Sequence, residues 1–196
     1  MRLDHIAFRV ADREQAAKFW IEAFGYKIQT TFEPKFSDGT SQGVKCIALE
    51  PPEKIPEGEI VPPFICWAQP IVLLGGDYDY HFNKDVQYHM APEIFISDGP
   101  PESIVGKWVD ERNGVGGIHH MAYQVKSVQE TMDLWMEKGW ADFLSNKPLT
   151  CPGLTQVFTK PNHLGVIFEF IEREKHGFCE DNVGALMEST KDVDGS

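Results

Sequence analysis

Two histidines and one glutamate are the residues of this sequence best suited to act together in chemistry. His5 and His120 hold matching places in two similar segments, and Glu169 sits between isoleucines in a strand-like segment whose two faces are both apolar. A lone buried carboxylate is costly unless a cation neutralises it. Two imidazoles and a carboxylate that leave coordination positions open suit Fe(II), Mn, Ni or Co, and less often Zn. The alternative is two core histidines and a salt-bridged Glu169, but the matched positions favour a metal site.

The match extends beyond the histidines and predicts a duplicated structural unit. Aligning His5 with His120 also aligns three further pairs: Ala7 with Ala122, Phe8 with Tyr123, and Trp20 with Trp135. Self-similarity at a fixed offset is typical of a repeated supersecondary unit. Aligning 92–96 with 168–172 places Glu93 on Glu169, so Glu93 is a candidate fourth ligand, the alternative being a solvated residue at the start of a strand. Strand alternation puts His119 on the face opposite His120, and we interpret His119 as structural.

Each half reads as a strand, a helix and three further strands. In the first half, His5, Ala7 and Arg9 share the face that would line an open or polar space, while Ile6 and Phe8 face a helix. That helix is expected to begin after Asp12 and to end at Gly25. The other expected elements are strands at 26–32, 44–49 and 93–97, then a strand at 118–125, a helix at 127–138, and strands near 142–144, 155–159 and 166–173.

These elements predict an α+β fold in which two βαβββ modules pair into a half-barrel around a metal cleft. We expect the first module at residues 1–112, with an irregular, proline-rich insertion at about 51–90, and the second module at 113–175. A tail follows at 176–196. Strands that begin the two halves would lie centrally, with both imidazoles pointing into the cleft.

The composition and charge of the chain argue against some classes of function. The 196 residues carry a net charge of −12 and a pI near 4.9, which argues against a nucleic-acid partner. The apolar runs are far too short to span a membrane. The N-terminus opens directly into a strand pattern without a signal segment, so we expect a cytoplasmic protein. The four scattered cysteines are expected to be reduced thiols rather than a zinc site.

At Asp4-His5, His119-His120 and Glu169 the chain resembles the vicinal oxygen chelate superfamily, which includes glyoxalase I, methylmalonyl-CoA epimerases and extradiol-type dioxygenases. The resemblance covers nearly the whole chain except the insertion. It implies the same paired βαβββ fold, a bound divalent metal, a small-molecule substrate and a homodimer.

The segments 156–161, 167–173 and 177–189 are similar to the end of 4-hydroxyphenylpyruvate dioxygenases. This likeness implies a tail helix at 176–196 that closes the site, and Fe(II) held by His5, His120 and Glu169. It also implies a 2-oxo acid substrate and dioxygen as partners. Gln156 would hydrogen-bond to substrate or oxygen, and Phe178 and Asn182 would bind the substrate. The catalytic residues would then be Glu169 and Gln156.

Two further functions stay open. A chain of this length has only the catalytic half of that dioxygenase family, and residues 102–120 also resemble the link between modules in methylmalonyl-CoA epimerases. The first alternative is therefore a redox-neutral lyase or isomerase of the glyoxalase I or epimerase kind, with Glu93 or Glu169 moving the proton. The second alternative is a binding protein that keeps the cleft without catalysis.

Overall fold

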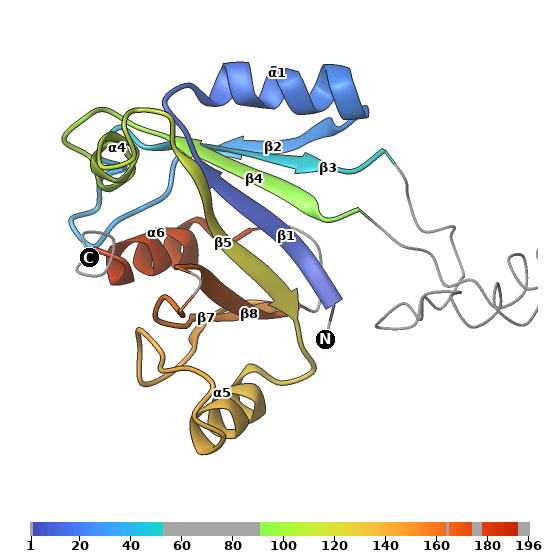
Figure 1. Cartoon of the computed structure of the whole chain (residues 1–196), viewed down its shortest axis with the longest axis vertical. Helices are drawn as coiled ribbons and strands as arrows, with labels where there is room; N and C mark the ends of the chain where they lie inside the picture. The colour runs from blue at the N-terminus through green and yellow to red at the C-terminus, as the bar shows by residue number, and fades with distance from the viewer. Residues whose placement is uncertain (1, 53–90, 164, 174–177, 192–196) are drawn as a thin grey trace, which may run out of the picture.

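The computed structural model describes residues 2–52, 91–163, 165–173 and 178–191, which form one curled eight-stranded sheet with helices on both faces (Figure 1). The predicted insertion at about 51–90 lies almost entirely outside the described residues. The first half comprises β1 (Arg2–Arg9), α1 (Arg13–Phe24), β2 (Lys27–Phe32), β3 (Lys45–Glu50) and β4 (Glu93–Asp98). Helix α4 (Ile104–Asp110) leads to β5 (Gly117–Gln124), α5 (Val128–Glu137), β6 (Leu149–Cys151), β7 (Leu154–Phe158), β8 (Ile167–Arg173) and the final helix α6 (Glu180–Ser189).

The strand order, β2-β3-β4-β1-β5-β8-β7-β6, confirms the predicted pairing of two similar halves into a half-barrel. The first strands of the halves, β1 and β5, are antiparallel neighbours at the centre. Each has a parallel partner on its other side, β4 for β1 and β8 for β5. The two halves are therefore joined by the strands that carry His5 and His120.

Local sequence explains where the helices begin and end. Asp12 is the N-cap of α1, its side chain accepting a hydrogen bond from the backbone N–H of Gln15, and Gly25 ends the helix in the left-handed conformation with φ 75°. Ser127 caps α5 in the same way, through the N–H of Glu130. The predicted start and end of α1 are confirmed, as is the predicted helix that follows β5.

The two faces of the sheet have separate apolar cores. On the outer face of the first half, Ile6 and Phe8 pack with Trp20 of α1, as the alternation predicted. Trp135 of α5 packs against Phe170 in the corresponding place of the second half, with ring centroids 4.7 Å apart. On the inner face, residues of β1, β3 and β4 pack against α4 and α6. The inner face is therefore covered by the two helices that are not part of the repeat.

One predicted strand is wrong. Residues 142–144 do not form a strand, and Phe143 makes only an isolated bridge to Thr159. Phe143 packs against the core under α5, so its apolar character reflects burial of a loop residue. The strand that pairs with β7 on the side away from β8 is β6, which follows Phe143 in the chain.

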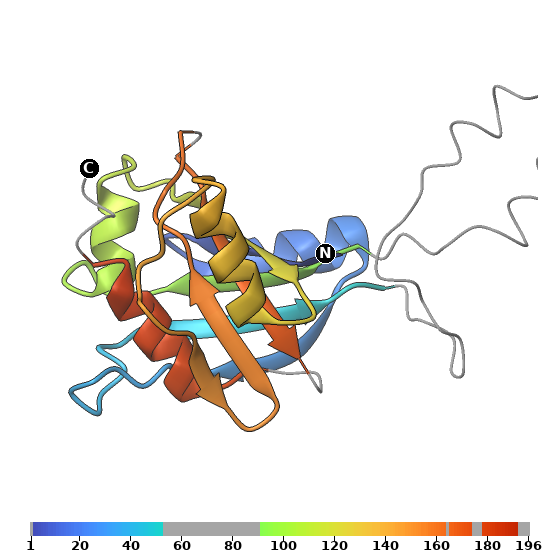
Figure 2. The same ribbon diagram turned by 90° about the horizontal axis from the view of Figure 1, so that it is seen from below.

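Helix α6 lies between the strands of the second half and the loop that follows β2 (Figures 1 and 2). Gly184 allows this close approach, because a Cβ there would collide with the backbone carbonyl of Lys35. The predicted tail helix is thus docked over the inner face of the sheet. None of the described helices is long and apolar enough to cross a membrane.

Candidate metal centre

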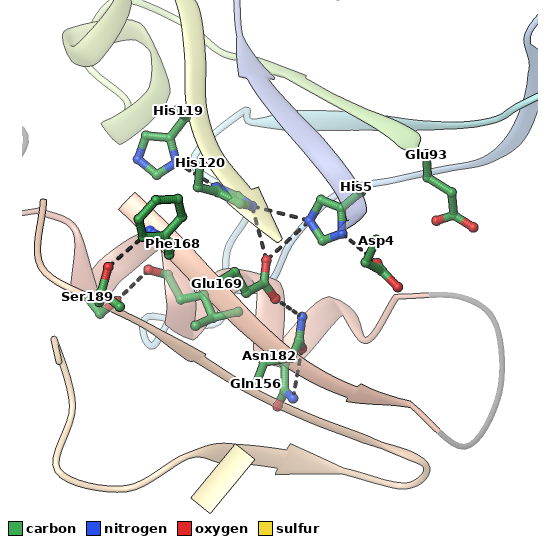
Figure 3. A network of polar contacts seen from close by, with 12 residues as sticks. Asp4, His5, Glu93, His119, His120, Gln156, Phe168, Glu169, Asn182 and Ser189 are labelled. Atoms are coloured by element: carbon green, nitrogen blue, oxygen red, sulfur yellow. Dashed lines mark hydrogen bonds and ion pairs between the residues drawn. The ribbon is translucent and has the colours of Figure 1, made fainter. Parts of the chain in front are cut away.

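His5, His120 and Glu169 meet at the central seam of the sheet, where they form the group of potential metal ligands found among the described residues (Figure 3). Nε2 of His5 lies 3.2 Å from Oε2 of Glu169 and 3.3 Å from Nε2 of His120. Nε2 of His120 lies 3.1 Å from the same Oε2. All three side chains are buried. The predicted triad is therefore assembled from β1, β5 and β8.

The spacing of these three atoms fits a single ion. Ligand atoms about 2.1 Å from one metal would be about 3.0 Å apart in octahedral geometry and about 3.4 Å apart in tetrahedral geometry. The observed separations of 3.1 to 3.3 Å lie within that interval. Two imidazoles and one carboxylate suit Fe, Mn, Co, Ni and Zn. The donor set thus fits a divalent metal without selecting one.

The electrostatics of the cluster favour a positive charge beside the Glu169 carboxylate. Burial would raise the pKa of Glu169, but the charge of His5 and hydrogen bonds with both histidines hold it well below its usual range. Burial alone would lower the pKa of His5, yet the Glu169 carboxylate and the bond to Asp4 raise it to about 9. Burial lowers the pKa of His120. Without metal, a proton on His5 balances Glu169, and a bound metal ion would replace that proton.

Asp4 and Arg173 fix the orientation of His5 on the side of its ring that faces away from Glu169. Nδ1 of His5 lies 2.8 Å from Oδ1 of Asp4, and Arg173 donates to both oxygens of that carboxylate, from Nε at 3.0 Å and Nη2 at 2.8 Å. Although burial would raise the pKa of Asp4, His5 and Arg173 lower it to about 2. Asp4 therefore stays ionised and accepts the Nδ1 proton of His5, which directs Nε2 toward the cluster.

His119 is not on the face opposite His120, and that prediction is wrong. Its Nδ1 lies 2.8 Å from Nδ1 of His120, and its ring packs against Trp108 and Phe158. The pairing of β5 with β1 shifts register between Ala7 and Phe8, so the alternation of side chains is interrupted at His119. A similar shift in β1 occurs beside Asp4. Each candidate ligand histidine therefore comes directly after a register shift. The shift brings the side chain of the preceding residue, Asp4 or His119, to the Nδ1 atom of His5 or His120.

Glu93 is not brought into the cluster (Figure 3). Its Oε1 accepts a hydrogen bond from Gln29, and its Oε2 lies 4.0 Å from Nη2 of Arg173. The strand registers explain the difference: Glu93 pairs with His5, whereas Glu169 pairs with Ala122, two residues beyond His120.

The residue equivalent to Glu169 in the first half is therefore Phe95, which pairs with Ala7. The predicted alignment was displaced by two residues, about 6.6 Å along a strand. The Phe95 ring stands 6.2 Å from that of His5, so an apolar side chain occupies the position where a symmetric site would have a fourth ligand.

Gln156 and Asn182 form a chain that ends on Glu169. Nε2 of Gln156 donates to Oε1 of Glu169 at 2.6 Å, and Nδ2 of Asn182 donates to Oε1 of Gln156 at 3.2 Å. The amide of Gln156 thus fixes the carboxylate oxygen that does not face the histidines. The structure places both residues beside the cluster, and their predicted contacts with substrate stay a prediction.

A cavity that is partly open to solvent adjoins the triad. Phe178, which precedes α6, lines it and stands edge-on to His5 with ring centroids 5.2 Å apart. Val183, Leu186 and Met187 of α6 form another wall. Arg9 and His119 also line the cavity. Apolar walls with a few polar groups are typical of small-molecule sites.

No role in the site was predicted for four residues around the cluster, which are Asp4, Arg9, His119 and Arg173. Asp4 and His119 nevertheless belong to the motifs that carry the family resemblance, and Arg9 was expected on the face that lines the cleft. Arg9 could have been predicted as a site residue from its position on the same face of β1 as His5. The strand alternates regularly between these two residues, and both line the cavity. Asp4 and His119 could not be assigned from alternation, since both are next to register shifts.

Several solved structures have a similar fold. A methylmalonyl-CoA epimerase matches with a TM-score of 0.61 and 24% identity, covering 89% of this chain and 97% of its own. The methylmalonyl-CoA epimerase of Mycobacterium tuberculosis matches with a TM-score of 0.57 and 18% identity over 89% of each chain. A hypothetical protein of Bacillus halodurans C-125 has a TM-score of 0.57 and 22% identity, covering 91% of this chain and 98% of its own. At these identities the likeness concerns the fold.

No curated protein matches the sequence significantly. The sequence profile of the Glyoxalase/Bleomycin resistance protein/Dioxygenase superfamily, however, matches residues 4–149. This range includes the two candidate ligand histidines, all of β5 and most of β1. Together with the paired βαβββ halves, the match assigns this chain to the Glyoxalase/Bleomycin resistance protein/Dioxygenase superfamily.

Proposed function

We propose that the protein is a metal-dependent enzyme that holds one divalent ion with His5, His120 and Glu169 and acts on a small molecule that chelates the ion. Of the reactions open to such a site, we propose a non-haem Fe(II) dioxygenase acting on an aryl 2-oxo acid. The observation that carries this proposal is that Phe95, which cannot bind a metal, stands where a symmetric site would have its fourth ligand. A site with two histidines, one carboxylate and several open positions is characteristic of non-haem Fe(II) oxygenases.

Fe(II) in this position would bring the 2-oxo acid and dioxygen together and activate dioxygen, while oxidative decarboxylation of the 2-oxo acid would supply electrons for its reduction. The protein's own contribution is to hold the three ligands on one side and leave the cavity side open. Gln156 keeps Glu169 in the orientation that presents Oε2 to the histidines. The rings of Phe95 and Phe178, 5.0 Å apart beside His5, would hold an aromatic side chain and exclude water.

The test is anaerobic loading with Fe(II), followed by measurement of oxygen uptake and CO2 release with a panel of aryl-pyruvates. Uptake should be lost in His5→Ala and retained in His163→Ala, which alters an exposed loop histidine. Absence of uptake across the panel by an iron-loaded preparation would reject the dioxygenase.

A redox-neutral epimerase or lyase is the second candidate, and the two epimerase structures with the same fold favour it. In that case a cavity group would move a proton beside the substrate carbonyl, and Glu169 and His119 are the candidate bases. Incubation of Co²⁺-loaded protein with 2-methyl-branched acyl thioesters in D2O distinguishes the reactions. Deuterium incorporation into the thioester would support the epimerase class, and absence of oxygen uptake by Fe(II)-loaded protein with the aryl-pyruvates would exclude the dioxygenase.

A further inference from the structure

A nearly buried arginine at the end of β8 contacts three separate parts of the chain. Arg173 follows Glu169 by four residues, so strand alternation places both side chains on the inner face of the sheet. Only 6% of the Arg173 side chain is exposed. Its guanidinium donates to both carboxylate oxygens of Asp4, at 3.0 and 2.8 Å, and lies 4.0 Å from Oε2 of Glu93. Its Cζ lies 4.9 Å from the centre of the Phe178 ring, which is within cation–π range.

Two of these partners, Asp4 and Phe178, also contact the candidate ligand His5. Oδ1 of Asp4 lies 2.8 Å from Nδ1 of His5, and the Phe178 ring stands at 78° to the imidazole. The four side chains therefore form a closed loop in which Arg173 is the member that does not touch His5 in any of these contacts. The hydrogen bond directs Nδ1 and the phenyl ring limits the tilt of the imidazole, so together they determine where Nε2 points.

The second half holds its histidine differently. The ring of Phe158, in β7, lies 4.7 Å from that of His120. Phe158 pairs with Glu169, whereas the equivalent of Glu169 in the first half, Phe95, pairs with Ala48. Ala48 is therefore the counterpart of Phe158 in the first half, and it has no ring to place beside a histidine.

Phe178 takes that role beside His5, and it comes from the tail. It packs against the apolar cluster that contains Ala48. Phe158 is fixed by the ladder of β7, but Phe178 precedes α6 and belongs to none of the described strands and helices. Its position therefore depends on side-chain contacts, and the guanidinium of Arg173 is the charged one among those given above.

We propose that Arg173 is a positioning residue for the metal ligand His5, and that through Arg173 the affinity for metal depends on Phe178, a tail residue that is not itself a ligand. This inference rests on the metal site of the proposed function. A ligand imidazole has to be held within about 10–20° of its productive orientation, which requires support from the residues around it. A guanidinium suits the task because its planar donors match a carboxylate while its face stacks on an aromatic ring.

The test measures Co²⁺ affinity by competition with a chromophoric chelator, together with the visible spectrum of the bound Co²⁺. Arg173→Met and Phe178→Leu should each weaken binding by about tenfold or more and alter the spectrum. The double variant should bind about as well as the weaker single variant, because both changes break the same loop. Independent contributions would instead multiply.

The matched control is Arg13→Met, which removes a partly buried arginine whose Nη1 lies 2.9 Å from Oδ1 of Asp98, away from the cluster. Phe143→Leu, in the core under α5, controls for loss of a phenyl ring. Both should keep Co²⁺ affinity within about twofold of the wild type. If Arg173→Met does not fold, Arg173→Lys replaces it, since lysine keeps the charge but loses the planar donors and face. It should weaken Co²⁺ binding severalfold and reduce the effect of Phe178→Leu.

Urea unfolding of the metal-free variants separates positioning from stability. Variants that are less stable but bind Co²⁺ like the wild type would identify Arg173 as a structural residue only and overturn the proposal. Losses that multiply in the double variant would overturn it as well, because Phe178 would then act on His5 without Arg173. A wild type that binds no Co²⁺ would reject the proposed function and this inference together. Coupled losses without oxygen uptake would support the inference and reject only the dioxygenase.

Discussion

At the scale of single residues, each of the three candidate ligands is held by a neighbour on the side away from the cluster. The pairs are His5 with Asp4, His120 with His119, and Glu169 with Gln156. Such partners set the orientation and tautomer of a metal ligand, and their loss typically costs 10- to 100-fold in metal affinity or activity. The partners differ, however, since one is a carboxylate, one an imidazole and one an amide.

Asp4→Asn should weaken binding of Co²⁺ or Ni²⁺ by about 10- to 100-fold, because the negative charge behind His5 is lost and Arg173 loses its charged partner. Competition with a chromophoric chelator measures the change. Asp12→Asn is the matched control, since asparagine caps a helix as well as aspartate does. Equal affinity of the Asp4 variant and the wild type would contradict the role given to Asp4.

For His120 to offer Nε2 to a metal, its Nδ1 must carry the proton and donate it to Nδ1 of His119. His119→Gln retains an acceptor and should keep metal affinity within about threefold, whereas His119→Leu should lose about tenfold or more. The same chelator competition compares the two variants. Similar affinities would show that the imidazole pair does not support the ligand.

At the scale of elements, the site depends on irregularities in two strands and on one docked helix. The register shifts in β1 and β5 bring Asp4 and His119 to the ligand histidines. Helix α6 contributes Asn182 to the chain that ends on Glu169 and covers one side of the cavity. The position of α6 is therefore connected to the orientation of a ligand.

Gly184→Ala should destabilise the docking of α6 by about 1–3 kcal/mol, because the added methyl group would meet the carbonyl of Lys35 in a tightly packed contact. Thermal unfolding measures the global loss, and limited proteolysis reports detachment of the C-terminal helix. Asp181→Ala, on the exposed side of the same helix, should change stability by only a few tenths of a kcal/mol. Equal effects of the two substitutions would contradict the close packing at Gly184.

At the scale of the whole molecule, the candidate metal centre spans the junction of the two halves. His5 belongs to the first half, and His120 and Glu169 belong to the second. An ion bound to all three would add a cross-link to the hydrogen bonds between β1 and β5. Metal binding should therefore stabilise both halves together.

Addition of Co²⁺ at 100 times its Kd should stabilise the protein by about 2.7 kcal/mol and raise Tm in a single transition. Differential scanning calorimetry checks the size and the cooperativity of the change. Glu169→Gln should lose most of the increase, while Glu137→Gln, an exposed change on α5, should retain it. Two separate transitions, of which metal shifts only one, would contradict a shared centre.

The fold and the meeting of the three candidate ligands could be predicted because they follow from periodic patterns. Strand alternation placed His5 and Ala7 on the inner face, and the repeat placed His120 in the same position. Features that depend on pairing between distant strands could not be predicted. The register of β4 against β1 moved Glu93 two residues away from its expected place, and the irregularity in β5 turned His119 inward.

The equivalence of Phe95 and Glu169 bears on how such a centre can arise. Had two identical single-module chains associated about a twofold axis, both copies would necessarily contribute the same side chain there, giving two carboxylates or two phenyl rings. Covalent fusion removes that constraint, because each copy can then mutate independently. A lone acid opposite an apolar wall is accordingly available to the fused arrangement and not to a dimer of identical modules, and it gives the cavity two chemically distinct sides.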